Sequence, residues 1–291
     1  MAQTKRVEPE PRALKPPPAG THAILRPGHE AVAYHIPTSS TKDDGTPLKS
    51  TIVLPRHSAW TSGLHFHATY TEFLRVVKGA IFVELNGKIK LISALAGGEV
   101  DAAGQLVQPG LVVEVYRYAI HNWGRLEHYN DSARFSGRKL HEQEILPEDW
   151  TEEVVVEEWT DPSDIAKPLF FWNLNGIITM PDDSILPKRQ MIAKTFLGKL
   201  WVELQLFVVF WELDNCPVFN VFQNVLPAHD SYLRVLRVLD AAEMLVSYVI
   251  LGLAKLFGLL LDLKAVEERR TPNGLWEAYE KLQHRQPLRD L

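Results

Sequence analysis

The sequence predicts a mainly β fold, an antiparallel β-barrel or sandwich, followed by an apolar α-helical C-terminal region. Short runs of β-branched and aromatic residues recur between about residues 22 and 140, with Gly, Pro, Asn and Asp between the runs. Their number and regular spacing are typical of a barrel or a sandwich. From about residue 191 onward the apolar runs become longer and follow a helical pattern.

Composition narrows the classes of function. The chain has 291 residues and a formal net charge of −5, from 31 Lys and Arg against 36 Asp and Glu. A mildly acidic chain is not a general nucleic-acid binder, so we expect no nucleic-acid partner. The single cysteine, Cys216, excludes an internal disulfide and any zinc site built from two or more cysteines. A metal site in this chain therefore needs His and carboxylate ligands.

The first two segments differ in character. Residues 1–20 are Pro-rich and charged without an apolar run, so we expect a disordered arm that is neither a signal peptide nor a membrane anchor. The expected location is therefore cytoplasmic. We expect the barrel over residues 21–141. Within it, two β runs flank Asn86 and Gly87, which is the strongest short hairpin signal that a sequence offers.

Residues 142–190 are predicted to form an acidic linker and irregular segment. Between Glu142 and Asp164 there are ten acidic residues and no Lys or Arg. A charge run of this kind is typical of a solvated segment. The three valines at 154–156 are the exception, because their composition suits an edge strand of the barrel.

Residues 191–291 are predicted to be helical and apolar. Segments 196–213 and 241–264 are apolar nearly all round, unlike an ordinary surface helix. A spanning helix needs roughly 20 apolar residues, and Lys255 and Asp262 interrupt the second segment. Three interpretations compete: a helical pair that dips into the cytosolic face of a membrane, a hairpin of two spans, and a homodimer interface. We favour the first.

The residues that carry chemistry lie in the β region. His65 and His67 are two residues apart, so on a strand their side chains share one face. A short turn after His67 allows the next strand to bring Glu72 back beside them, and Gly79 ends that strand where a tight turn is needed. Two imidazoles and one carboxylate suit Fe(II) in non-haem oxygenases, and also Mn, Ni, Cu or Zn. We therefore predict one divalent metal ion and favour Fe(II).

A fourth ligand is expected from a later strand. His121 follows a β run and directly precedes a predicted turn, which makes it the leading candidate. His57 and His128 are the competing donors. Three His and one Glu leave two open positions in an octahedral shell.

The run His-x-His-x4-Glu-x6-Gly at 65–79 resembles the first motif of the cupin superfamily. The resemblance implies a small jelly-roll barrel with one metal ion at its centre. It also implies His65, His67 and Glu72 as ligands, with His121 as the histidine of a second motif. A single barrel followed by apolar helices is similar to the cupin-domain proteins of fungal secondary-metabolite clusters, which implies an oxidoreductase acting on a polyketide-type intermediate.

The sequence departs from the cupin pattern at four positions. Ala59 stands where the first motif has a leading Gly, and Arg125 stands where the second motif has Asn. Tyr116 and Tyr118 stand where Pro and Gly are usual. These departures imply an altered turn at the mouth of the barrel.

The predicted ligands serve two kinds of reaction. With Fe(II), O₂ in one open position gives oxygenation or C–C cleavage. Alternatively, the metal acts only as a Lewis acid in a decarboxylation, isomerisation, dehydration or cyclisation. The second chemistry needs a general acid or base, and Tyr116, Tyr118 and His57 are candidates by position.

The expected partner is a hydrophobic small molecule. Leu74 and Val76 share the inward face with Glu72, and Trp60 and Trp123 lie close to the ligands in sequence, which predicts an apolar pocket. Two other classes stay open, a non-catalytic metal- or ligand-binding barrel and a membrane-tethered scaffold.

Deletion of residues 191–291 is expected to separate the classes. An enzyme with a membrane tether should keep turnover and lose membrane association. A scaffold should lose its phenotype outright.

Overall fold

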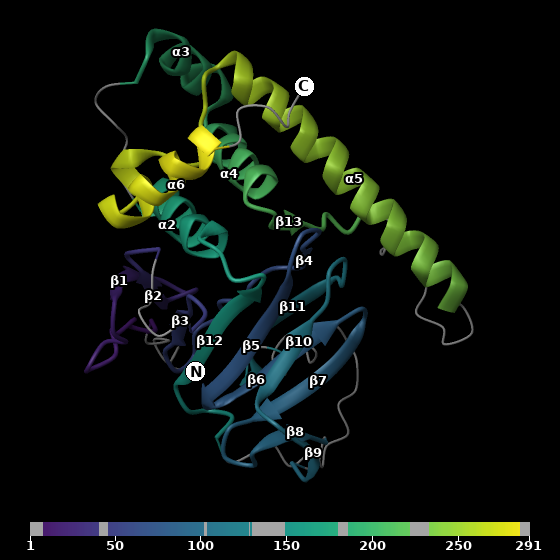
Figure 1. The fold of residues 1–291 in the computed structure, drawn as a ribbon. Coiled ribbons are helices and arrows are strands. Elements are labelled where there is room, and N and C mark those ends of the chain that lie inside the picture. Colours follow the sequence, from purple (N-terminus) through teal and green to yellow (C-terminus); the bar gives the residue numbers. More distant parts are fainter. Residues whose placement is uncertain are drawn as a thin grey trace, which may run out of the picture. The chain divides into compact units, whose positions relative to one another are not determined.

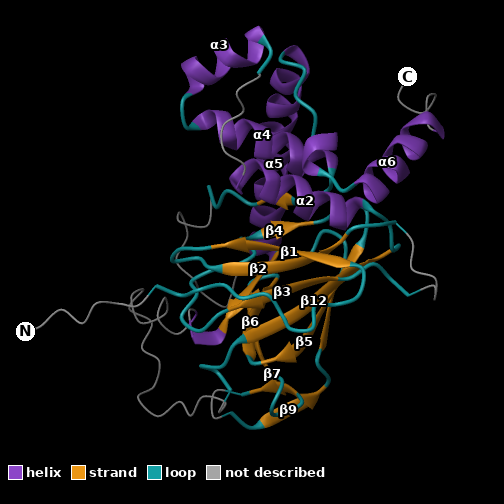
Figure 2. Cartoon of the chain, turned by 90° about the vertical axis from the view of Figure 1, so that its left-hand side faces the viewer, coloured by secondary structure: helices purple, strands orange, loops and turns teal. Residues whose placement is uncertain are grey.

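The computed structural model describes residues 8–40, 46–101, 104–127, 129, 149–179, 186–221 and 233–285. The chain forms two compact units. The first unit comprises residues 1–63 and 70–163, and the second comprises residues 64–69 together with 164–291. Strands dominate the first unit and helices dominate the second (Figure 1, Figure 2).

The first unit confirms the predicted antiparallel β fold. Its strands are β1 (Thr21–Arg26), β2 (Val32–Pro37), β3 (Ser50–Leu54), β5 (Thr71–Lys78), β6 (Ala80–Leu85), β7 (Lys88–Ser93), β8 (Gly98–Val100), β9 (Leu106–Pro109), β10 (Val112–Val115), β11 (His121–Arg125) and β12 (Val154–Asp161). One sheet has the order β1-β2-β3-β12-β5-β10, and the other contains β11-β6-β7-β8-β9 in that order. Every pairing between these strands is antiparallel.

Strand β12 changes the predicted boundary of the barrel. The sequence predicts a linker from residue 142 with an edge strand at 154–156. Instead, β12 pairs with β3 on one side and with β5 on the other, so it is an interior strand. Its three valines are buried, as an interior strand requires. The ring of Trp159 stacks on Phe73 of β5, with 5.4 Å between the centroids.

Two turns have the conformation that their residues predict. Asn86 and Gly87 join β6 to β7 with φ angles of 49° and 74°, as a tight hairpin turn requires. Gly79 lies between β5 and β6 with φ of 76°. A Cβ atom at Gly79 would lie 2.7 Å from the carbonyl oxygen of Glu153, so the chain is packed too closely there for any side chain.

The predicted N-terminal arm contacts this unit. Leu14 packs on the buried side chains of Ala33, Val53 and Val155. Its backbone N–H donates a hydrogen bond of 3.0 Å to Nε2 of the buried His35. Leu14 therefore covers a small apolar cluster over β2, β3 and β12.

The second unit is helical apart from two short strands. Its elements are β4 (His65–Phe66), α2 (Ala166–Thr179), α3 (Lys188–Leu197), α4 (Leu200–Glu212), β13 (Cys216–Pro217), α5 (Leu233–Leu260), η1 (Glu268–Arg270) and α6 (Asn273–Arg285). Helix α4 packs against α2 and α5 (Figure 1). The predicted helix at 196–213 is divided, because Gly198 ends α3 with φ of 55°. Cys216 is buried, and burial raises the pKa of its thiol to about 12.

Helix α5 has a buried face of mixed character and an exposed apolar face. One face is buried and carries Glu243, Ser247, Leu251, Ala254 and Gly258. The other face is exposed and carries Leu245, Val249, Leu253, Leu256 and Leu260. Residues Val238–Leu260 are long and apolar enough to cross a membrane, and 28% of an 18-residue apolar window within them is buried in the protein. No other helix among the described residues has this length and composition.

Candidate metal centre

Three short stretches of chain supply the predicted ligands: residues 65–67, strand β5 with Glu72, and the start of β11 with His121. Strand β4 carries His65, and His67 follows two residues later, with Phe66 buried between them. In β5, burial alternates: Glu72, Leu74 and Val76 are buried and Arg75 is exposed. This confirms that Glu72 shares its face with the two apolar side chains.

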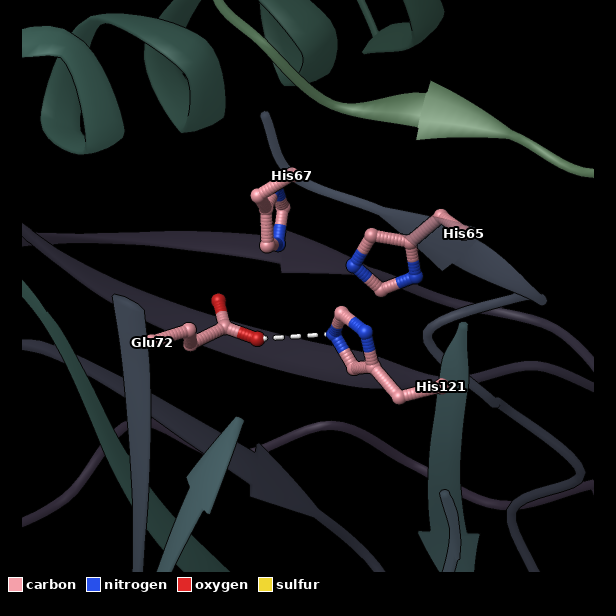
Figure 3. Close-up of side chains that lie close together, drawn as sticks. All are labelled: His65, His67, Glu72 and His121. Carbon is pink, nitrogen blue, oxygen red and sulfur yellow. Dashed lines mark hydrogen bonds and ion pairs between the residues drawn. The ribbon is translucent and has the colours of Figure 1, made fainter. Parts of the chain in front are cut away.

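The structure brings the four predicted ligands together. The donor atoms of His65, His67, Glu72 and His121 all lie within 4.8 Å of one another. The four side chains point toward a common centre (Figure 3). Each residue is at most 5% exposed. A buried group of three imidazoles and one carboxylate can hold a metal ion, as the resemblance to cupins implies.

The chemistry of the donors fits a cation. Nε2 of His121 lies 2.9 Å from Oε2 of Glu72, and its Nδ1 lies 3.0 Å from the carbonyl oxygen of Ala119. A carbonyl oxygen can only accept, so Nδ1 of His121 carries the hydrogen. In a neutral ring, the lone pair of Nε2 then faces the carboxylate. A metal ion bound by both atoms would remove that repulsion.

A hairpin tip fixes the backbone just before His121. The backbone N–H of Asn86 donates to the carbonyl oxygen of Ile120 at 2.7 Å. In return, the N–H of Ile120 donates to the side-chain oxygen of Asn86 at 3.0 Å. The β6–β7 turn that the sequence predicts therefore also positions a ligand.

The ring of His67 is held by a hydrogen bond at its Nδ1 atom. Nδ1 of His67 lies 2.6 Å from the backbone carbonyl oxygen of Asp214. The imidazole must donate this bond, which leaves Nε2 as the ligand atom. Sequence reasoning missed Asp214. The only local signal is an Asp-Asn pair directly after an apolar helix.

The three candidate acid–base residues are exposed and lie outside the group of four donors. Tyr116 is 62% exposed and its hydroxyl bonds to the carboxylate of Glu114 at 2.9 Å, which raises the pKa of Tyr116. Tyr118 is 52% exposed. His57 is also exposed, and its Nδ1 lies 2.6 Å from Glu127. Their catalytic role remains a prediction, and the competing donor His128 lies outside the described residues.

Two departures from the cupin pattern have a structural explanation. Tyr118 adopts a φ of 61°, the left-handed conformation that a Gly at this position takes without strain. Arg125 is fully buried and donates to the carbonyl oxygens of Leu54 and Glu152, at 3.2 and 2.7 Å. It also pairs with the carboxylate of Glu127 at 3.1 Å. Arg125 therefore ties the end of β11 to neighbouring segments.

The interior beside His121 is aromatic. Trp123 lies two residues further along β11, on the same face, and is fully buried. Its ring contacts that of Trp60, with 4.9 Å between the centroids. The indole N–H of Trp123 donates to the buried carboxylate of Glu158 at 2.8 Å. Glu158 was not predicted, because its neighbours in sequence are those of an acidic linker.

Comparisons with known proteins find similarity only among solved structures. No family model and no curated protein matches the chain. The chain is similar to KdgF from Halomonas sp., with 16% identity, 44% of this chain and 79% of that chain covered, and a TM-score of 0.24. A predicted oxalate decarboxylase from Thermotoga maritima has 14% identity, 47% and 88% coverage, and a TM-score of 0.26. A cupin-2 domain from Rhodospirillum rubrum has 11% identity, 66% and 91% coverage, and a TM-score of 0.29.

The two antiparallel sheets and the buried His-His-Glu-His group agree with the cupin-type barrel that the resemblance in the sequence implies.

Proposed function

We propose that this protein is a metal-dependent oxidoreductase that acts on a hydrophobic small molecule. The observation that carries the proposal is the buried group of His65, His67, Glu72 and His121, whose donor atoms converge within 4.8 Å. Four protein ligands leave open positions on an octahedral ion, and Fe(II) in such a site supplies oxygenation or C–C cleavage with O₂. Mn, Ni, Cu and Zn suit the same donors.

The protein's own residues set the conditions around the ion. Glu72 provides the negative charge, and its burial keeps water from competing for the donors. The hydrogen bonds of His67 and His121 to backbone carbonyls fix which ring nitrogen is presented. Leu74, Val76 and Trp123 make the surrounding interior apolar, which suits a hydrophobic substrate better than a sugar. On the resemblance alone, we propose a polyketide-type intermediate of secondary metabolism.

The first test is the metal content of the purified full-length protein by elemental mass spectrometry. We expect one equivalent of iron, lost in a His65→Ala, His67→Ala double variant. The matched control is His22→Ala, His29→Ala, which removes two exposed histidines and should keep the metal.

The possible results separate the competing functions. Iron, together with O₂ consumption that depends on an added aromatic polyketide, supports the proposal. Manganese, nickel or zinc that turns over substrate without O₂ contradicts the redox reaction and indicates Lewis-acid catalysis. A protein that takes up no metal when offered it would be a binding or scaffold protein, and the proposal would fail.

We also propose that helices α3 and α5 contact an anionic membrane surface. Exposed apolar side chains gather on both helices: Met191, Ile192 and Phe196 on α3, and Leu256, Leu259 and Leu260 on α5. Phe196 is 90% exposed. The side chain of Gln190 donates to the carbonyls of Leu261 and Asp262, which links the start of α3 to the end of α5.

Charge favours a membrane as the partner of this surface. Residues 186–202 contain four basic side chains, Lys188, Arg189, Lys194 and Lys199, and no Asp or Glu. Basic residues among exposed apolar ones match anionic lipid headgroups above an acyl layer. A dimer interface would not need the cations.

Co-sedimentation with vesicles tests this surface. We expect binding to phosphatidylglycerol vesicles that weakens with salt and is lost in Ile192→Ser, Phe196→Ser. Leu95→Ser, Val107→Ser is the control, since these side chains are also apolar and exposed but lie in the first unit. Absence of vesicle binding, with a concentration-dependent dimer that the α3 variant abolishes, would instead identify a homodimer interface.

A further inference from the structure

Asp214 makes two kinds of contact with the ligand loop. Its backbone carbonyl accepts the hydrogen bond from Nδ1 of His67 at 2.6 Å. Its carboxylate accepts from the backbone N–H groups of Ala68 and Thr69, at 2.9 and 2.7 Å. The same carboxylate accepts from the hydroxyl of Thr69 at 2.6 Å. One residue thus holds both the ring of His67 and the backbone that follows it.

The backbone at Asp214 is suited to this position. Its φ is 51°, in the left-handed region that Asp and Asn tolerate better than other side chains do. The residue comes just after the end of α4 at Glu212 and just before β13. The left-handed conformation turns the chain between these two elements.

Strand β13 supports the preceding ligand in the same way. Cys216 pairs with Phe66, and Pro217 pairs with His65, in an antiparallel arrangement. Beyond the strand, the N–H of Val218 donates to the carbonyl oxygen of Leu64 at 2.8 Å. Residues 214–218 therefore fix the backbone on both sides of the two histidines.

We propose that Asp214 is a positioning residue for the metal ligand His67, and that segment 214–218 is part of the metal centre's support. The proposal rests on the proposed metal site. A carbonyl that accepts from one ring nitrogen selects the tautomer and orients the other nitrogen for coordination. The hydrogen bonds from Ala68 and Thr69 to the carboxylate of Asp214, which we call the carboxylate clamp, hold that carbonyl in place relative to the ring of His67.

The test compares three variants of the full-length protein. Asp214→Gly keeps the left-handed backbone but removes the carboxylate clamp. Asp214→Asn keeps the backbone and one acceptor oxygen, and should restore most of the function of the clamp. Asp262→Gly is the matched control, since Asp262 is also an aspartate with positive φ (54°) in the second unit, and its side chain is exposed.

Two measurements distinguish positioning from a purely structural role. Calorimetric titration of the metal-free proteins with Zn(II) should show an affinity about tenfold or more lower in Asp214→Gly, with Asp214→Asn close to wild type and Asp262→Gly unchanged. Nitrogen NMR of the metal-free proteins should show His67 protonated on Nδ1 in the wild type and as a mixture of tautomers in Asp214→Gly. A fall in stability alone would not change the tautomer.

Each outcome decides one question. If wild type takes up no Zn(II), the proposed metal site fails and this inference fails with it. If wild type binds one equivalent and Asp214→Gly binds equally tightly with an unchanged tautomer, the positioning role is wrong while the metal site stands. If Asp214→Gly does not fold, Thr69→Val replaces it, because it removes one bond to the clamp from an exposed side chain. It should weaken Zn(II) binding in the same direction, and unchanged binding would contradict the proposal.

Discussion

Tyr118 shows how a single position can depart from a sequence motif and still keep the backbone conformation. Its φ of 61° is one that a bulky residue rarely adopts. The left-handed region costs an L-residue roughly 1–2 kcal/mol. The side chain is half exposed, so packing offsets little of that cost. The turn before His121 therefore stores strain that a glycine would not.

We expect Tyr118→Gly to leave the free energy of unfolding unchanged or to raise it by up to about 1.5 kcal/mol. Relief of the left-handed strain offsets the entropy, roughly 0.5–1 kcal/mol, that a glycine loses on folding. Tyr116→Gly is the control: it is similarly exposed and lacks positive φ, so it should lose stability. Urea unfolding followed by tryptophan fluorescence measures both. An equal loss of unfolding free energy in the two variants would contradict backbone strain at Tyr118.

At the scale of elements, features that depend on neighbours in sequence were predicted, and pairings between distant segments were not. The alternation in β5, the Asn86–Gly87 hairpin and the same-face placement of His65 and His67 all follow from neighbours in sequence, and all are confirmed. The two-residue pairing of β4 with β13 joins segments about 150 positions apart, and a strand that short has no periodicity to read.

The strand predicted at 154–156 exists as part of β12, but its length and its interior position were not predicted, for a different reason. Its acidic residues, such as Glu157, have the composition of a solvated segment, which concealed an interior strand. In the sheet, Glu157 pairs with Lys49 at 3.0 Å, so the charge is compensated by a neighbouring segment that sequence periodicity does not reveal.

The contact between Leu14 and β2 predicts a dependence of stability on pH. Burial lowers the pKa of His35 from its ordinary value of 6.5, and Nε2 must stay unprotonated to accept from Leu14. Because the unfolded chain binds the proton more tightly, stability should fall as the pH drops through 6.5 toward the lower folded value. His35→Gln, which keeps an acceptor and does not titrate, should lose less stability than wild type between about pH 7.5 and about pH 5.5 in urea unfolding. An unchanged loss would contradict this account.

At the scale of the whole molecule, residues of the C-terminal region contact two of the candidate metal ligands. Deletion of residues 191–291 is expected from the sequence to spare turnover, but it would remove Asp214 and β13, which hold His67 and His65. Ligand types and spacing reveal the donors of a site. The residues that orient the donors come from segments chosen by tertiary structure, and sequence spacing does not reveal them.

We therefore expect the 191–291 deletion to lose metal binding even where the strands of the first unit still form. Elemental analysis gives the metal content, and far-UV circular dichroism gives the β content. A shorter deletion, of residues 273–291, leaves 214–218 in place and should keep the metal. Full metal occupancy after the longer deletion would show that the C-terminal region is only an attachment.

The pairing of His67 with a residue 147 positions later also sets an order of events during synthesis. A ribosome adds roughly 5–20 residues per second, so roughly 7–30 s separate the appearance of the histidines from that of Asp214. During that interval the nascent chain contains His65 and His67 but not segment 214–218, which we propose orients them. We therefore expect the proposed site to reach its full affinity for a metal ion only late in synthesis, after most of the strands have been made.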